Sequence, residues 1–513
     1  MKASITAFPA LAISLFLFAC SEVKKELIPG QEKDFCSAIH RNDSVNLSQT
    51  LAPVKNLMET KTGVYVLEDG DAAMISRAWL SEYAEKTMDI QYFIFSTDNV
   101  GLIACDYIVR AADRGVKVRI LVDDILVEAG PDEIMALDSH KNIDIKIYNP
   151  GINLGKNIVQ KAGAWAKDFK KSNQRMHNKT FTVDGKITIT GGRNIADEYF
   201  DYDHEYNFRD RDVLLIGKLC EQVQQSFETF WNYEASVPVA QVLQIVSVQK
   251  EGKGNFERLH QYACNPDNYW PQVRDKVRYI PQAFKMLMDS GLIVWTDSIQ
   301  FISDKPGKND GNKGLSGGGI STDSLFALAK RAKKCIDIQS PYLIMDEKGI
   351  ELMRQIAARG VKIRILTNSL ASTDNLEAFS GYQRCRKALL AANVRVFEMR
   401  PDAEKRFKIM TGALQKKMNY SPIFGLHAKS MVIDNSTAVV GTFNIDPRST
   451  NLNTECVTVI RSEKIAKEIS QQMEEEFRPE NAWETTADWN PDAKAGVKKQ
   501  VKAATKRVFP KSI

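Results

Sequence analysis

The sequence predicts an α/β protein built from two copies of one domain, each a mixed, mostly parallel sheet flanked by helices. Two observations support this prediction. A strand, helix and strand pattern occurs at residues 88–122 and again at 335–366, and a short polar motif recurs at a similar interval. Because self-similarity within a chain indicates repeated structural units, we expect the two copies to meet at a pseudo-twofold interface.

Both copies of the pattern have the same internal order. Each starts with the strand-like tripeptide Asp-Ile-Gln, continues through an amphipathic helix, and returns in a strand that reads KVRIL or KIRIL. The helices end at Arg114-Gly115 and Arg359-Gly360, and glycine is common just past a helix end. A strand, helix and strand in this order form a right-handed parallel crossover, so we expect parallel strands in both halves.

The 513 residues suffice for two domains of ordinary size. We expect the first domain at 56–302 and the second at 323–480. Residues 303–322 are rich in Gly, Lys and Asp, which is typical of a flexible linker or surface loop. Residues 481–513 are expected to form a basic C-terminal tail, in which residues 494–511 form either an amphipathic helix on anionic lipid or a solvated segment.

The N-terminus is typical of an export signal. Residues 1–20 combine the positive charge of Lys2 with an apolar run that ends at Cys20. The run Leu17–Cys20 resembles a bacterial lipobox, in which Cys20 is lipidated, and an uncleaved anchor helix is the alternative. Residues 21–55 are polar and are expected to form a tether. We therefore expect a membrane-anchored lipoprotein of the bacterial cell envelope, on the periplasmic side.

Charge and cysteine content limit the expected partners. The net charge of +5 is small for this length, and no basic track interleaved with aromatic residues appears. The seven cysteines that follow Cys20 are dispersed, with no CxxC pair and no histidine at metal-ligand spacing. We expect no metal, no cofactor and no nucleic-acid partner, and the oligomeric state stays open.

Each half contains one HxKxxxxD motif. In each motif the His and Lys stand two positions apart in an apparent strand, so they project from the same face. The Asp precedes a tight turn, and an Asn follows ten residues later. The first copy comprises His177, Lys179, Asp184 and Asn194, and the second comprises His427, Lys429, Asp434 and Asn444. One copy could arise by chance, but two copies in register with the domain repeat indicate a functional site.

These motifs, with the phrases RMHNKTFTVDG, GGRNIADEYF, FRDRDVLLIG and GTFNIDPRSTNLNTE, resemble the phospholipase D superfamily. Within it the chain is most similar to bacterial cardiolipin synthases of the short type without N-terminal transmembrane helices. The resemblance covers roughly residues 60–480. It implies a duplicated phospholipase D-like fold, with the active site between the halves at the pseudo-twofold axis.

The resemblance also implies a reaction. A phosphatidyl group would pass from phosphatidylglycerol or phosphatidylethanolamine onto phosphatidylglycerol and form cardiolipin, with phospholipids as substrates and the membrane surface as partner. The alternative is a phospholipase D that hydrolyses phospholipids to phosphatidic acid. A nuclease and a noncatalytic lipid-binding scaffold are less favoured.

Substitution at a phosphodiester needs a nucleophile, an acid for the leaving alkoxide, and positive charge around the nonbridging oxygens. Two histidines and two lysines supply all three. By resemblance, His177 attacks phosphorus, while His427 protonates the leaving alcohol and then deprotonates the acceptor; the residues themselves leave the assignment open. These roles require a neutral His177 and a protonated His427.

We expect an acidic partner to orient each imidazole. Asp212 precedes the strand VLLIG and Glu455 precedes the matching strand CVTVI, so we predict that Asp212 holds His177 and that Glu455 holds His427. The two lysines and the two asparagines of the motifs are expected to contact phosphate, and the two motif aspartates to support loops. Residues 151–175 approximate an amphipathic face, which is either a lipid-contacting helix or an ordinary packing helix.

Overall fold

The computed structural model describes residues 45–126, 130–154, 156, 169–244, 256–311, 314–410 and 422–506, together with 35, 37 and 39. The predicted export signal with Cys20, and most of the amphipathic segment before His177, lie outside these residues. Within the described ranges, no helix is both long and apolar enough to cross a bilayer.

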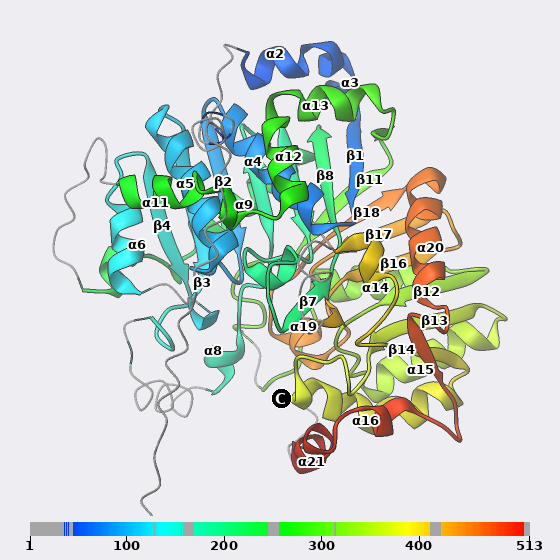
Figure 1. Cartoon of the computed structure of the whole chain (residues 1–513). Coiled ribbons are helices and arrows are strands. Elements are labelled where there is room, and N and C mark those ends of the chain that lie inside the picture. Colours follow the sequence, from blue (N-terminus) through cyan, green and yellow to red (C-terminus); the bar gives the residue numbers. More distant parts are fainter. Residues whose placement is uncertain are drawn as a thin grey trace, which may run out of the picture.

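The first half is built on a nine-stranded sheet with the order β10-β1-β8-β6-β5-β2-β3-β4-β9 (Figure 1). In this sheet β2, β3 and β4 are parallel neighbours, and the other pairs are antiparallel. Its strands are β1 (Thr62–Leu67), β2 (Thr87–Tyr92), β3 (Lys117–Asp123), β4 (Ile143–Tyr148), β5 (Thr180–Val183), β6 (Ile187–Gly191), β8 (Asp212–Gly217), β9 (Ser236–Pro238) and β10 (Val294–Thr296).

The second half repeats this plan in an eight-stranded sheet with the order β11-β18-β17-β16-β12-β13-β14-β19. Here β12, β13 and β14 are the parallel neighbours. Its strands are β11 (Ile299–Ser303), β12 (Cys335–Gln339), β13 (Lys362–Asn368), β14 (Val394–Met399), β16 (Lys429–Ile433), β17 (Thr437–Gly441), β18 (Cys456–Arg461) and β19 (Ala482–Thr485).

The duplicated α/β fold with mixed sheets is confirmed, but the prediction of mostly parallel sheets is wrong. Parallel pairing arises where a helix carries the chain back across the sheet. The motif strands instead form the hairpins β5-β6 and β16-β17. Their turns contain Asp184 at φ 52° and Asp434 at φ 53°, a left-handed conformation that aspartate tolerates.

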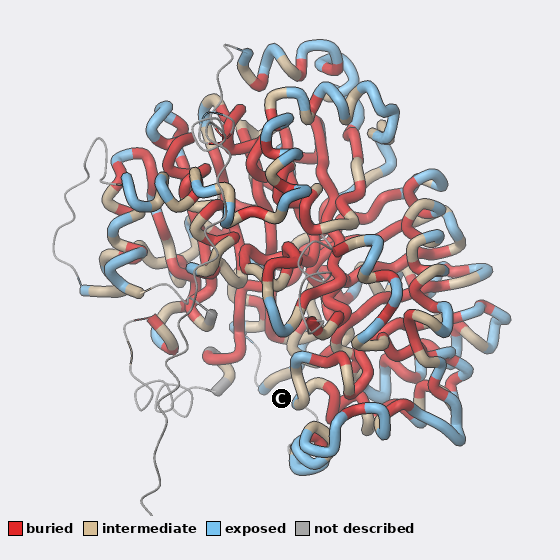
Figure 2. Tube along the Cα trace, in the orientation of Figure 1, coloured by how far each residue is buried: buried red, intermediate tan, exposed pale blue. Residues whose placement is uncertain are grey.

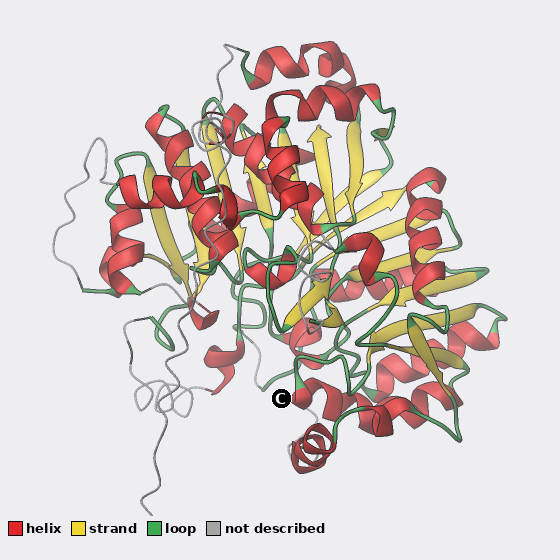
Figure 3. Cartoon of the chain, in the orientation of Figure 1, coloured by secondary structure: helices red, strands yellow, loops and turns green. Residues whose placement is uncertain are grey.

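Helices lie on both faces of each sheet (Figure 3). The longer helices of the first half are α4 (Gly70–Tyr83), α5 (Asn99–Asp113), α6 (Pro131–Asp138), α9 (Leu219–Trp231), α11 (Glu257–Ala263), α12 (Pro271–Arg278) and α13 (Ile280–Asp289). Those of the second half are α14 (Ile320–Lys330), α15 (Glu347–Ala358), α16 (Leu376–Ala391), α20 (Glu463–Glu476) and α21 (Val497–Lys506). Short helices are α2 (Leu47–Leu51), α3 (Lys55–Thr60), α8 (Phe169–Asn173), α10 (Val239–Val242), α17 (Arg406–Ile409) and α19 (Pro447–Asn451).

The repeat seen in the sequence is also a repeat of contacts. Arg119 on β3 lies opposite Asp89 on β2, with Nε 2.7 Å from Oδ1. Arg364 on β13 lies opposite Asp337 on β12, also with Nε 2.7 Å from Oδ1. The two crossovers therefore share register and charge pairing, and corresponding residues of the two halves can be compared directly.

The two halves share a buried interface, visible as the continuous red region at the centre of Figure 2. Apolar residues from the inner faces of both sheets and from α9 and α20 form one core cluster there. A short parallel pair, β7 (Tyr206–Arg209) with β15 (Ile423–Leu426), joins the halves through backbone hydrogen bonds. Arg211 donates to Gln339 Oε1 at 2.5 Å and to Ser430 Oγ at 2.8 Å. The halves are thus held in a fixed relation.

The predicted linker belongs to the folded body. The chain leaves the first sheet after β10 and enters the second at β11, before the expected boundary at 302. Lys308 Nζ lies 2.9 Å from Asp304 Oδ2 and donates to the carbonyls of Ser449 and Asn453 at 2.7 and 3.0 Å. Both charged residues are buried. The polar composition of residues 303–322 suggested a solvated segment, but Lys308 and Asp304 form an ion pair inside the protein, which offsets the cost of burying their charges.

The described part of the predicted tether also packs on the first half. The ring of Phe35 lies 5.1 Å from that of Tyr269, and Arg110 donates to the carbonyl of Ile39 at 2.7 Å. These contacts place the start of the folded body before residue 55.

Cys264, in the first half of the chain, is disulfide-bonded.

The predicted tail begins as part of the second half. β19 pairs with β14, and α21 packs on α16, where Ser380 Oγ donates to the carbonyl of Ala503 at 3.0 Å. The segment therefore contains a helix with one face against protein, and the expected contact of this helix with anionic lipid stays a prediction.

Candidate active site

His177 and His427 lie where the two halves meet. Each precedes its hairpin, and each is tied to the backbone of the other half. The amide of His177 donates to the carbonyl of Thr454 at 3.0 Å, and the amide of His427 donates to the carbonyl of Arg209 at 2.8 Å. Both side chains are buried. The site therefore requires both halves, as the pseudo-twofold arrangement predicted.

The acidic partners of the histidines also come from the opposite half. His177 Nδ1 lies 2.8 Å from Glu455 Oε2, and His427 Nδ1 lies 2.6 Å from Asp210 Oδ2. The predicted pairs, Asp212 with His177 and Glu455 with His427, are both wrong. Asp212 instead accepts hydrogen bonds from Arg77 Nη2 at 2.9 Å and from the amide of Arg193 at 3.2 Å.

Strand register explains why Asp210, and not Asp212, is the acidic partner from the first half. Gly191 pairs with Asp212, whereas its counterpart Gly441 pairs with Val457. The structural counterpart of Glu455 is therefore the residue two positions before Asp212, which is Asp210. The sequence offered both aspartates in the phrase FRDRD, but strand pairing decides which one reaches an imidazole.

The motif lysines lie beside the histidines in a buried cluster. Lys429 Nζ is 2.8 Å from His427 Nδ1 and 3.0 Å from Nε2. Lys179 Nζ donates to the carbonyl of His177 at 2.9 Å and lies 5.4 Å from the ring centre of Phe93. This arrangement concentrates positive charge in a region shielded from water, where a phosphate anion would be strongly attracted.

Burial and mutual repulsion control the protonation of this cluster. Burial, reinforced by Lys179 and Lys429, holds the pKa of His177 well below its usual value. Burial and Lys429 lower the pKa of His427 to about 4, against the expectation of a protonated His427. Burial also lowers the pKa of Lys179 to about 7 and that of Lys429 to about 8. The free site thus keeps both imidazoles neutral at neutral pH.

The asymmetry between the two halves lies in the acidic partners. Burial raises the pKa of Glu455 to about 7, although Thr442 and Ser449 donate hydrogen bonds to it. Burial alone would raise the pKa of Asp210 as well, but the interactions with His427 and Lys429 keep it below its usual value. His427 therefore faces the more strongly ionised carboxylate, which suits it to carry a proton once substrate charge is present.

The motif aspartates are not part of this cluster. Asp184 accepts hydrogen bonds from the amides of residues 85–87 at 2.7 to 2.9 Å. Asp434 accepts from the amides of residues 333–335, with shortest contacts of 2.6 to 3.0 Å. Each carboxylate holds the loop that leads into β2 or β12.

The two asparagines differ. Asn194 Oδ1 accepts a hydrogen bond from the amide of Ile94 at 3.1 Å. The side-chain oxygen of Asn444 is buried and has no hydrogen-bond partner among the described residues. Asn444 is therefore the better placed of the two to contact a ligand.

Comparison with known proteins identifies the family. The family described as "Cardiolipin synthase, PLD-like domain" matches residues 80–231 and 325–478, which covers more than half of the chain. Cardiolipin synthase C of Escherichia coli (strain K12) is 34% identical over 82% of this chain and 86% of its own length. An uncharacterized protein of Helicobacter pylori (strain J99) is 32% identical over 81% of this chain and 80% of its own.

A solved structure matches in fold. The phosphatidylserine synthase of Haemophilus influenzae aligns with a TM-score of 0.55 over 90% of this chain and 100% of its own, at 12% identity. The likeness concerns the fold alone at that identity. With both HxKxxxxD motifs joined in one buried site, the chain belongs to the cardiolipin synthase family of phospholipase D-like proteins and is an enzyme of the phosphatidyltransferase or phosphodiesterase type.

Proposed function

We propose that this protein is a phosphatidyltransferase that forms cardiolipin from phosphatidylglycerol and a second phospholipid. The observation that carries the proposal is the pair of buried histidines, each held by a carboxylate of the opposite half and each beside a lysine. The similarity to cardiolipin synthase C supports a lipid substrate.

In the proposed first step, His177 Nε2 attacks phosphorus while its Nδ1–H donates to Glu455. The bond from phosphorus to the leaving alkoxide breaks, and a phosphohistidine forms. His427 gives its proton to the alkoxide. In the second step His427 takes the proton of the acceptor hydroxyl, whose oxygen attacks phosphorus and releases His177. Protons and bonds balance over the two steps, and water in place of the acceptor would give hydrolysis.

The low pKa values of His177 and His427 in the free site fit these two reaction steps. A neutral imidazole is needed for attack, and burial keeps His177 neutral. A phosphodiester carries one negative charge, which raises the pKa of nearby cationic groups. Substrate entry therefore favours protonation of His427 and both lysines at the point where they are needed, next to the nonbridging oxygens. Asp210 stabilises the resulting imidazolium through its 2.6 Å contact.

Burial of the site supports transfer over hydrolysis. Lys179 and Lys429 are 1% and 4% exposed, and both histidines are 6% exposed. A phosphohistidine in such a place meets little bulk water, whereas an alcohol delivered by a second lipid is held in position.

The test is to incubate the purified protein with phosphatidylglycerol vesicles and to analyse the lipids by mass spectrometry. Cardiolipin with released glycerol is expected, and phosphatidic acid in its place would show a phospholipase D. Lipids unchanged against a no-enzyme control would refute both. His177→Ala should abolish product and the acid-labile phosphoryl adduct. Full activity of this variant would refute the proposed nucleophile.

We also propose that the enzyme is an exported lipoprotein anchored through Cys20, on the periplasmic side of the cell envelope. The apolar run before Cys20 supports export. The disulfide at Cys264 supports an oxidising compartment, because disulfides persist there. Cys20→Ala should move the protein from the membrane to the soluble fraction, and unchanged fractionation of this variant would refute the lipid anchor.

A further inference from the structure

A large cavity lies in the second half, between α14, α15 and the sheet face that carries Met431. Its volume is about 730 Å³, within the range of ligand pockets and far above the voids of ordinary cores. Apolar side chains dominate its wall, among them Leu325, Phe326, Met353, Val439 and Phe443. Lys429 also lines it, so the cavity adjoins one of the two motif lysines.

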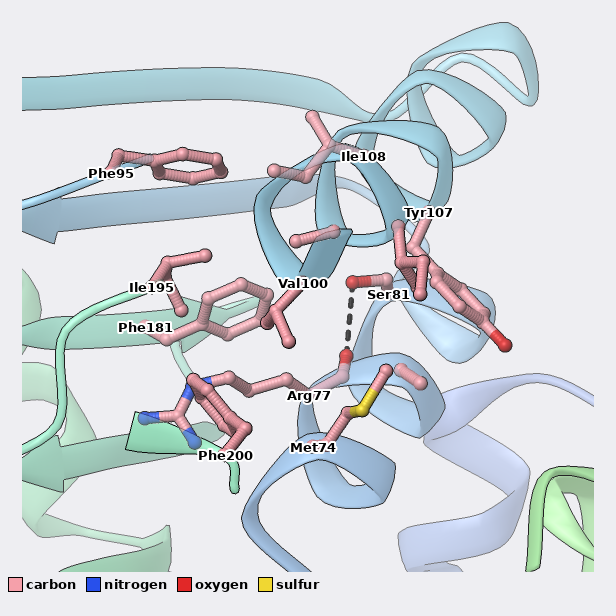
Figure 4. Close-up of a pocket in the computed structure, with 13 residues that line it drawn as sticks. Met74, Arg77, Ser81, Phe95, Val100, Tyr107, Ile108, Phe181, Ile195 and Phe200 are labelled. Carbon is pink, nitrogen blue, oxygen red and sulfur yellow. Dashed lines mark hydrogen bonds between the residues drawn. The ribbon is translucent and has the colours of Figure 1, made fainter. Parts of the chain in front are cut away.

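The corresponding place in the first half is almost filled. The pocket there, between α4, α5 and the sheet, has a volume of about 30 Å³. Figure 4 shows Phe181, Val100 and Ile195 directed toward the side chain of Arg77, with the ring of Phe200 beside it. The guanidinium of Arg77 lies 5.5 Å from the centre of that ring. Large side chains therefore occupy this space in one half.

The internal repeat shows which residues of the second half correspond to Arg77 and Phe200. Arg77 stands twelve residues before Asp89, and Leu325 stands twelve before Asp337. Phe200 stands six residues after its motif asparagine, and Thr450 occupies that place in the second half. Both counterparts line the larger cavity.

The polar partner has changed as well. Arg77 is paired with Asp212 at 2.9 Å, and strand register makes Val457 the counterpart of Asp212. Val457 also lines the cavity. The second half has thus exchanged a buried ion pair and an aromatic ring for smaller, mostly uncharged groups. One of two equivalent places is filled and the other is open, which is the asymmetry expected if a ligand enters only one half.

We propose that this cavity binds one acyl chain of the phospholipid whose phosphate lies at His177 and Lys429. The inference rests on the proposed lipid substrate and assigns the cavity its place in recognition. The headgroup phosphate meets the lysines at the junction of the halves, and the chain runs from Lys429 past Met431 to Met353 and Val439. Exposed Asp346 and Lys348 lie at the rim. The enzyme would therefore distinguish long from short acyl chains through the second half alone.

The first experiment fills the cavity with the double variant Leu325→Trp, Thr450→Phe. Its control is Ala327→Phe, which places an aromatic ring on the exposed face of the same helix. Each methylene excluded from an apolar site changes affinity about fourfold. We expect kcat/KM for dioleoyl phosphatidylglycerol in mixed micelles to fall at least about tenfold, since two or more methylenes lose their place. Turnover of dihexanoyl phosphatidylglycerol should stay within about twofold of wild type.

Equal effects on both substrates, or none on either, would overturn the proposal. The Ala327→Phe control should match wild type with both substrates. A loss with the long substrate in this control, as large as in the filled variant, would also overturn it.

A second experiment uses the unmodified protein and needs no turnover. Phosphatidylglycerol with a diazirine at the middle of one acyl chain is irradiated with the protein, and labelled peptides are mapped by mass spectrometry. Label on α14 and α15 supports the proposal, even if vesicle assays give no product and the proposed reaction fails. Label confined to other elements overturns it. Label on α14 and α15 by a diazirine fatty acid, but not by the phosphatidylglycerol probe, would also overturn it.

Discussion

Replacing Asp210 by asparagine tests the crosswise acid partner directly. The 2.6 Å contact with His427 Nδ1 is buried, and a hydrogen bond to a charged group contributes about 1.5–3 kcal/mol. If Asp210→Asn loses that stabilisation of the imidazolium in the transition state, kcat should fall about ten- to 150-fold, at about 1.4 kcal/mol per factor of ten. The fold and the packing around His427 should remain in this variant, because the asparagine amide has nearly the size of the aspartate carboxylate.

The pH dependence gives a second readout with a defined sign. The charge and hydrogen bond of Asp210 raise the pKa of His427 against burial, so their removal lowers it further. The protonated form of His427 is then lost at lower pH, and the alkaline limb of kcat should move to lower pH. Initial rates of cardiolipin formation, measured by mass spectrometry across pH, check both effects.

Asp212→Asn is the matched control, two positions away. Asp212 is paired with Arg77, and removing one partner of a buried ion pair costs about 3–5 kcal/mol. Its Tm should therefore fall while its alkaline limb stays in place. A displaced limb in Asp212→Asn, or a rate within twofold of wild type and an unmoved limb in Asp210→Asn, would refute the assignment.

Three further predictions concern other parts of the molecule. Because burial lowers the pKa of Lys179 to about 7, KM for phosphatidylglycerol should rise above about pH 7 as the ammonium group loses its proton. Lys179→Arg should flatten this rise of KM, and an equal rise in both proteins would contradict the prediction. Asp184→Ala and Asp434→Ala each remove an acceptor of several backbone amides, so each should lower stability by about 1–3 kcal/mol with kcat nearly unchanged, as measured by thermal unfolding and initial rates. Cys264→Ser should cost about 2–4 kcal/mol through loss of the disulfide, and dithiothreitol should lower the Tm of wild type but not of this variant.

The sequence predicted the duplicated α/β fold and the two His-Lys pairs because both depend on local signals. Periodicity, a glycine after each helix and the spacing within each motif all lie within a few dozen residues. The buried pair of Lys308 and Asp304 within the linker segment was not foreseen, and the acid partners were predicted wrongly. The burial of Lys308 against Asp304 depends on Ser449 and Asn453, which are far away in the chain, so composition alone could not indicate it.

The sequence by itself determined the chemistry available to this protein, namely two imidazoles and two ammonium groups, with each His-Lys pair two residues apart just before or at the start of β5 or β16. Only the tertiary structure decided which carboxylate orients which imidazole. That choice depends on strand register, and Asp210 and Glu455 reach the histidines because each crosses the interface between the halves. It also decided that one half is filled by Arg77 and Phe200 while the other keeps a cavity, since space within a layer depends on side chains from several elements at once.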